Sequence, residues 1–168
     1  MFIRKLFFTI ALVIPVAATA QTISERTARD ETVNMRSEEP AMRKAFARAA
    51  ATLPEFFALA AKPKAGTSHY AIKVAITDGR NTEYFWVGEF SNKGDAFSGT
   101  LHNEPELIKK YKNGDRITFK RTQIVDWTYM DDANEKMLGN FTACALLSRE
   151  PPEQAAAFMQ EYGLSCEK

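Results

Sequence analysis

Asp126 is the acidic residue whose sequence surroundings most suggest chemistry. It follows an apolar pair and precedes Trp127, where a charged side chain must face solvent or find a partner. A carboxylate held there could act as a general acid or base, with Asn103 or Asn140 as positioning groups. The alternative is a structural ion pair between Asp126 and one of three basic residues, Arg116, Lys120 or Arg121.

Aromatic and polar side chains surround this aspartate in the sequence. Trp127 and Tyr129 share one face of an expected strand, and Trp86 lies on another expected strand. These faces serve either as core or as a binding surface. The polar residues could line a ligand pocket ringed by the two tryptophans, or form a structural corner in which Asn103 caps a helix and Asp126 accepts backbone donors. The candidates for contact with a ligand or partner are Trp86, Asn103, Asp126, Trp127, Tyr129, Asn140 and Thr142.

Other kinds of chemistry find no support in the sequence. The glycines form no phosphate-binding loop, and Ser98 lacks the flanking glycines of a nucleophile elbow. The two histidines, His69 and His102, do not stand in metal-binding spacing. Glu83 and Glu89 share one strand face but lie about 20 Å apart, too far for the paired acids of a glycosidase. We therefore expect no metal and no cofactor, and the sequence favours a protein without catalysis.

The N-terminal residues predict export. Two basic residues precede an apolar run of about eleven residues, and an Ala-Thr-Ala run follows, which is the pattern of a secretory signal. We expect residues 1–20 to be removed by cleavage between Ala20 and Gln21. The apolar run is too short to cross a bilayer, so the expected product is periplasmic and has no stable membrane insertion.

Charge and cysteine content fit that location. The chain has 22 Lys and Arg against 21 Asp and Glu, a formal net charge of +1, which argues against a nucleic-acid partner. The two cysteines, Cys144 and Cys166, are expected to form a disulfide after export. Closing that loop stabilises a fold by about 3 kcal/mol in the chain-entropy model. Two unrelated buried thiols are the alternative.

Periodicity predicts helices at both ends of the domain. Residues 21–36 are polar and are expected to form a tail or a loosely docked strand, and Ser37 is the expected N-cap of the first helix. Thr52 and Glu55 have capping-box spacing, which predicts the start of a second helix. The apolar spacing of Ala155, Phe158, Met159 and Tyr162 predicts a last helix, which ends at Gly163. Residues 141–147 fit a helix or a buried strand.

The middle of the chain predicts strands. Apolar alternation around an Asp-Gly turn predicts a hairpin of residues 72–90, followed by strands at 97–101, 116–120 and 123–130. A capping pattern at Asn103 predicts a short helix ending near residue 111, and residues 131–138 are expected to be a polar loop. The predicted fold is α+β: a single domain of residues 37–168 with a curled antiparallel sheet of about five strands and helices from both ends packed on it.

The motifs of the strand region resemble the YegJ-like domain of unknown function in bacteria. The resemblance begins near residues 39–42 and 52–56 and runs to Leu147. It is carried by the runs Glu83-Tyr84-Phe85-Trp86-Val87, Phe97-Ser98-Gly99-Thr100-Leu101 with Asn103 and Pro105, Gly114-Asp115, Ile124-Val125-Asp126-Trp127 and Gly139-Asn140-Phe141-Thr142. The resemblance implies a small bacterial domain without an established activity.

Together these features favour an exported, non-catalytic binding or interaction protein, with an inhibitor or immunity protein as its more specific form. The expected partner is an envelope protein or a small ligand. The alternative is an enzyme acting in the envelope, with Asp126 as acid or base and Asn103 or Asn140 in a Trp-lined pocket.

Overall fold

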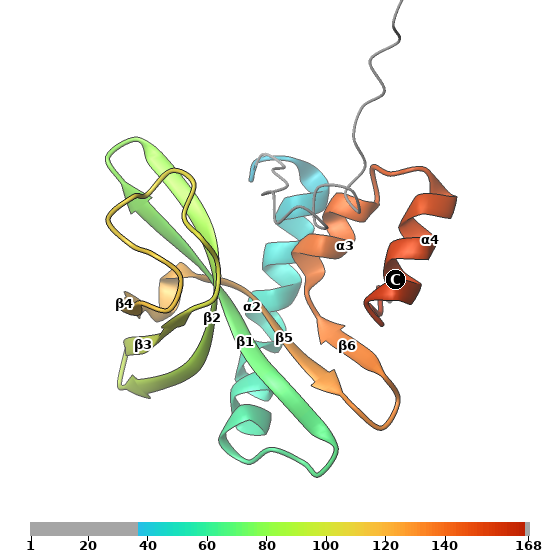
Figure 1. Ribbon diagram of the computed structural model, residues 1–168, viewed down its shortest axis with the longest axis horizontal. Helices are drawn as coiled ribbons and strands as arrows, with labels where there is room; N and C mark the ends of the chain where they lie inside the picture. Colours follow the sequence, from blue (N-terminus) through green and yellow to red (C-terminus); the bar gives the residue numbers. More distant parts are fainter. Residues whose placement is uncertain (1–36, 167–168) are drawn as a thin grey trace, which may run out of the picture.

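The computed structural model describes residues 37–166, which form a single α+β domain (Figure 1). Within these residues, six strands make one antiparallel sheet in the order β4-β3-β2-β1-β5-β6, with helices near both ends of the chain. The predicted fold class is confirmed. The predicted signal peptide, its cleavage between Ala20 and Gln21, and the polar tail at 21–36 lie outside the described residues.

Helix α2 (Pro40–Ala61) is continuous, although two helices were expected here. Its N-cap is Glu39 and not Ser37. The Thr52 hydroxyl donates to the Arg48 carbonyl at 2.8 Å, so it bonds back within the helix and does not cap a new one. Pro54 removes one backbone donor, but an unbroken apolar stripe offsets that loss by burial. The buried residues of this stripe are Met42, Ala45, Ala49, Leu53 and Phe56.

The first three strands follow the predicted hairpins. β1 (Thr67–Asp78), β2 (Asn81–Lys93) and β3 (Ala96–Leu101) pair antiparallel in sequence order. Ile72 and Val74 are fully buried, as period-two alternation requires. Register shifts interrupt the β2–β3 and β1–β5 pairings, and such irregularities bend a sheet and increase its twist.

The second half of the sheet contains one strand more than expected. β4 (Arg116–Lys120) has the predicted bounds, and β5 (Ile124–Asp131) follows it after the short 3-10 helix η1 (Arg121–Gln123). The prediction of a polar loop at 131–138 is wrong, because β6 (Lys136–Gly139) pairs with β5 as a short edge strand. Its four residues are too few to show an alternation pattern.

The helix expected after Asn103 is also absent, and residues 102–115 form an irregular connection. The carboxylate of Glu83, which is buried on β2, accepts the backbone N–H groups of Glu106, Leu107 and Ile108 at 2.6, 3.1 and 2.9 Å. This acceptor comes from a neighbouring strand and holds the segment as a loop, so the local capping pattern does not decide its structure.

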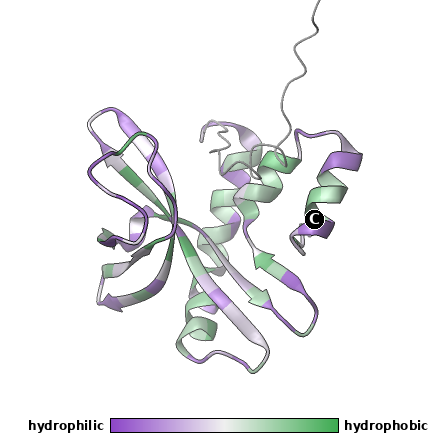
Figure 2. Cartoon of the chain, viewed as in Figure 1, coloured by the Kyte–Doolittle hydropathy of each residue, from purple (hydrophilic) through white to green (hydrophobic). Residues whose placement is uncertain are grey.

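Two short helices complete the domain. α3 (Phe141–Leu147) settles the ambiguous segment as a helix, and it packs on α2 and β5. α4 (Pro152–Glu161) follows it. In Figure 2, hydrophilic residues mark the turns of the β1–β2 and β5–β6 hairpins, while hydrophobic residues gather where α2 and α3 meet. None of the helices in the described part of the chain is both long and apolar enough to cross a membrane.

Candidate functional site: a buried carboxylate network and an aromatic groove

The pairing of β1 with both of its neighbours brings a lysine and an aspartate together. Lys73 on β1 is the direct cross-strand partner of Asp126 on β5 and of Trp86 on β2. Directly paired residues point to the same face of a sheet. The pairing therefore places a cation, a carboxylate and an indole next to one another on one face, and α3 begins beside them.

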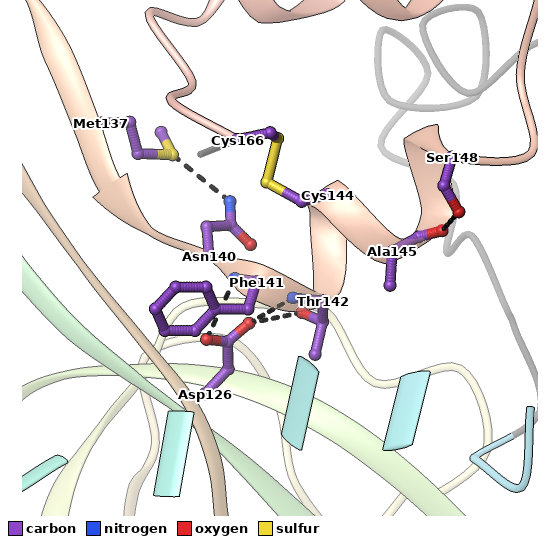
Figure 3. The surroundings of a disulfide bond; sticks show 9 residues. All are labelled: Asp126, Met137, Asn140, Phe141, Thr142, Cys144, Ala145, Ser148 and Cys166. Atoms are coloured by element: carbon purple, nitrogen blue, oxygen red, sulfur yellow. Dashed lines mark hydrogen bonds between the residues drawn. A yellow bond between two sulfur atoms is a disulfide. The ribbon is translucent and has the colours of Figure 1, made fainter. Parts of the chain in front are cut away.

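The Asp126 carboxylate is fully buried and fully hydrogen-bonded, and Figure 3 shows its bonds to Phe141 and Thr142. Oδ1 accepts the N–H groups of Trp127 at 2.9 Å and of Phe141 at 3.2 Å. Oδ2 accepts the N–H of Thr142 at 2.8 Å and its hydroxyl at 2.7 Å. A carboxylate has about four lone-pair positions, and four donors of this chain fill them.

Lys73 completes what we call the Lys73–Thr142–Asp126 network. Its Nζ donates to the Thr142 hydroxyl oxygen at 2.7 Å and lies 4.6 Å from the centre of the Trp86 ring. The cation that acts on Asp126 is therefore Lys73, and the expectation of an ion pair with Arg116, Lys120 or Arg121 is wrong. The partner was missed because Lys73 lies between two buried apolar residues, where alternation suggests a solvent-facing side chain.

Burial and charge act against each other within this network. Burial raises the pKa of the Asp126 carboxyl above its ordinary value, while Lys73 and the donors of Thr142 and Trp127 oppose that rise. Burial lowers the pKa of the Lys73 ammonium, and Asp126 opposes that change. Burial therefore disfavours the charged form of both groups, and each charge favours the other.

The network's visible effect is to anchor α3. Phe141 and Thr142 are the first residues of this helix, and their N–H groups have no acceptor within it. The preceding Asn140 supplies no side-chain cap and has a left-handed backbone with φ of 50°. Asp126 takes the place of a capping residue from a neighbouring strand, with the negative charge that favours a helix N-terminus.

The other predicted site residues lie in separate places. Trp127 is the cross-strand partner of Ile72 and donates from Nε1 to the Thr52 hydroxyl at 3.0 Å, so it faces away from Trp86 and Asp126. Asn103 does not cap a helix, because its Oδ1 accepts the Trp86 N–H at 2.6 Å. The two tryptophans therefore do not ring one pocket.

Tyr129 and Asn140 take further positions. The Tyr129 ring stacks on Tyr70 with a centroid distance of 5.2 Å. Asn140 donates from Nδ2 to the Met137 sulfur at 3.3 Å, and its buried Oδ1 has no hydrogen-bond partner among the described residues. Neither side chain takes part in the hydrogen bonds that surround Asp126.

The predicted disulfide is confirmed. Cys144 on α3 is bonded to Cys166, with a Cα–Cα distance of 5.6 Å (Figure 3). Backbone contacts continue the attachment, since Ser165 donates to Met137 on β6 at 3.1 Å. Ser165 and Cys166 are thus tied to the edge of the sheet and to α3.

An open cavity lies elsewhere, in a place that the sequence did not indicate. The aromatic groove, as we name it, has a volume of about 320 Å³ and lies between the end of α2 and the β2–β3 hairpin. Its lining includes Phe57, Phe90, Phe97, Asp95 and Arg121. Each phenylalanine reads as a core residue in its own segment, and only the tertiary fold brings the three rings to one opening. Among the described residues, no group of three or more His, Cys, Asp or Glu is placed to hold a metal.

Comparison with known proteins agrees with the resemblance in the strand motifs. Residues 39–166 match the model of a family described as "Uncharacterized protein conserved in bacteria (DUF2314)". The chain is 30% identical over 118 residues to "Uncharacterized protein YegJ" of Escherichia coli (strain K12), an alignment that covers 70% of this chain and 74% of that protein. No solved structure matches. The chain therefore belongs to the DUF2314 family of uncharacterized bacterial proteins.

Proposed function

We propose that this protein is an exported binding protein that retains its ligand without converting it. The observation that supports the proposal is the complete hydrogen bonding of the Asp126 carboxylate within its own chain. All four acceptor positions of its carboxylate are filled by groups of its own chain, three of them backbone N–H groups. A general acid or base must exchange a proton with substrate, and Asp126 would first have to release a donor that anchors α3.

The Thr142 hydroxyl is the strongest argument for the enzymatic alternative. It lies between an amine and a carboxylate, an arrangement that activates nucleophiles in enzymes. However, Thr142 is only 3% exposed, and its hydroxyl proton is directed at Asp126 rather than at Lys73. An acyl or phosphoryl group would need an approach to a hydroxyl oxygen that the fold covers.

The Cys144–Cys166 bond supports the export part of the proposal. Disulfides form and persist in the bacterial periplasm and are rare in the cytosol of ordinary bacteria. A bond that attaches the last helix to the domain contributes to stability only where it stays oxidised. This agrees with the basic, apolar and small-residue pattern of residues 1–20.

The test begins with the full chain expressed in its source bacterium. Mass spectrometry of the periplasmic fraction should find a product that begins at Gln21 and contains the intact disulfide. That product, immobilised and exposed to periplasmic extract, should retain a ligand that is recovered chemically unchanged. A reduced, unprocessed cytoplasmic protein would contradict export, and release of a converted product would contradict binding without turnover.

The matched variant for this experiment is Thr142→Val, which keeps the shape of the side chain and removes its hydroxyl. We expect the folded variant to retain the same ligand as the wild type. If the enzymatic alternative holds, Thr142→Val abolishes product formation while the variant remains folded. Far-UV circular dichroism of both proteins separates loss of function from loss of fold.

A further inference from the structure

The aromatic groove combines an apolar base with open access. Phe57 lies 5.3 Å from Phe97 and 6.1 Å from Phe90 between ring centroids, so three rings from α2, β2 and β3 meet there. The cavity of about 320 Å³ lies near the lower limit for small-molecule sites, which range from about 300 to 1,000 Å³. Its size fits a ligand with one ring or one branched side chain.

The rim of the groove carries one charge of each sign. The Arg121 guanidinium lies 5.4 Å from the centre of the Phe57 ring, which places the cation over the aromatic base. Asp95, from the turn between β2 and β3, also lines the cavity. Among the described residues, neither side chain forms an ion pair, and the backbone N–H of Arg121 donates to the Asp95 carbonyl at 3.4 Å.

We infer that the aromatic groove binds a free α-amino acid with an aromatic or branched apolar side chain. The ligand carboxylate would pair with Arg121, its ammonium group with Asp95, and its side chain would lie on the three phenylalanines. Both side chains are exposed and solvated by water, so a purely apolar ligand would gain nothing from either charge, and a simple anion would meet the Asp95 carboxylate. A zwitterion with an apolar side chain offers an opposite charge to each of the two side chains and an apolar group to the aromatic rings.

This inference rests on the proposed function, because it names the ligand class of a binding protein. The disulfide-bonded protein purified from cells expressing the full chain would be titrated with L-phenylalanine by isothermal calorimetry. Two analogues serve as chemical controls: 3-phenylpropionate lacks the ammonium group, and phenethylamine lacks the carboxylate. We expect L-phenylalanine to bind at least about tenfold more tightly than either, since each lost charge removes a charge-assisted hydrogen bond.

Variants place the ligand in the groove. Arg121→Gln and Asp95→Asn should each weaken L-phenylalanine binding by about tenfold or more. Arg80→Gln is the matched control, because Arg80 is an exposed arginine in the turn at the opposite end of β2. Amide chemical-shift changes on adding L-phenylalanine should concentrate at Asn92, Gly94 and Asp95, and this measurement needs no variant.

Two results would overturn the inference. The first is the absence of saturable binding of L-phenylalanine and L-leucine at millimolar concentration. The second is binding that Arg121→Gln leaves unchanged or that shifts amides outside the groove. Either result leaves the proposed function standing if periplasmic extract yields another unconverted ligand. Conversion of bound L-phenylalanine to a product would instead contradict the proposed function.

Discussion

Replacing Asp126 by asparagine should reveal how much of the domain's stability passes through the Lys73–Thr142–Asp126 network. The change keeps the shape of the side chain but replaces one acceptor oxygen by an amide nitrogen that donates. At least one of the backbone N–H groups that now point at Asp126 then loses its acceptor. Lys73 also loses the negative charge that opposes the effect of burial on its ammonium group.

The expected loss is large. Removing one partner from a buried charge pair costs about 3–5 kcal/mol, against a total stability of about 5–15 kcal/mol for a domain of this kind. With a urea m-value of about 2 kcal/mol/M, a loss of 4 kcal/mol lowers the unfolding midpoint by about 2 M. The measurement is equilibrium urea denaturation of the oxidised protein at pH 7, followed by tryptophan fluorescence and circular dichroism.

Lys73→Met supplies the informative comparison. Methionine preserves the apolar stem over Trp86. Asp126 loses its opposite charge, but the four hydrogen bonds that it keeps still stabilise the carboxylate, so we expect this variant to lose about 1.5–3 kcal/mol, less than Asp126→Asn. In Asp126→Asn the lysine has already lost its opposite charge. The double variant should therefore be more stable than the sum of the single effects predicts, by about 1.5–3 kcal/mol.

Two results would refute this reasoning. One is additivity of the two changes within about 0.5 kcal/mol, which would mean that the residues do not act together. The other is a Lys73→Met variant that loses as much as Asp126→Asn. If Asp126→Asn does not fold, Thr142→Val replaces it in the cycle, with an expected single loss of about 1–3 kcal/mol from the acceptor and donor left behind.

Three further predictions concern the sheet and the attached C-terminal segment. Cys144→Ser should lose about 3 kcal/mol, and reductant should lower the melting temperature of the wild type to that of the variant; equal melting without reductant would contradict it. Gly139→Ala should lower the free energy of unfolding, measured by urea denaturation, more than Gly79→Ala does. Both glycines have positive φ, but a Cβ at Gly139 would clash with the Trp127 backbone, while a Cβ at Gly79 meets nothing within 4 Å. Equal losses of stability would contradict this reasoning. Burial, and to a lesser extent neighbouring charges, raises the pKa of the Tyr129 hydroxyl above its value of about 10 in the unfolded chain. Its contribution to the free energy of unfolding is therefore present below about pH 10 and is lost as the pH rises above that value. Above that pH the wild type should lose more stability than Tyr129→Phe, and parallel curves of unfolding free energy against pH would contradict the assignment.

Local pattern predicted the elements whose structure is decided locally. Alternation and the Asp-Gly turn gave β1 and β2 their places, and the apolar stripe located α2. The same local reasoning placed a helix boundary at Pro54, because capping-box spacing looks alike at a helix start and inside a helix. The helix continues through Pro54 because apolar residues on both sides of it, such as Leu53 and Phe56, are buried against the rest of the domain. Such burial depends on the tertiary fold and is not visible in the local sequence.

The candidate site depends on pairings that local pattern does not contain. Asp126 was identified because a charge in an apolar strand demands a partner, but Lys73 lies 53 residues earlier and meets it only through the β1–β5 register. The aromatic groove likewise needs the end of α2 to lie beside the β2–β3 turn. The disulfide was the exception, because the chain has only two cysteines and the predicted export favours their oxidation, which left a single pairing.

Several polar side chains that drew attention in the sequence satisfy the backbone of their own fold. Glu83 accepts three N–H groups of the 102–115 connection, Asp126 accepts three at the β5–α3 junction, and Asn103 accepts the N–H of Trp86. Glu83 and Asp126 hold segments that have no ladder of their own, and Asn103 joins such a segment to β2, at the free-energy cost of burying a polar or charged group. A polar residue at such a position is thus explained by folding alone. Asp95 and Arg121 differ from these residues, because among the described residues their side chains form no hydrogen bond and stand exposed at the aromatic groove. They can meet a ligand without releasing a donor of their own chain, whereas Asp126 cannot, and this contrast is the physical reason to look for the ligand at the groove.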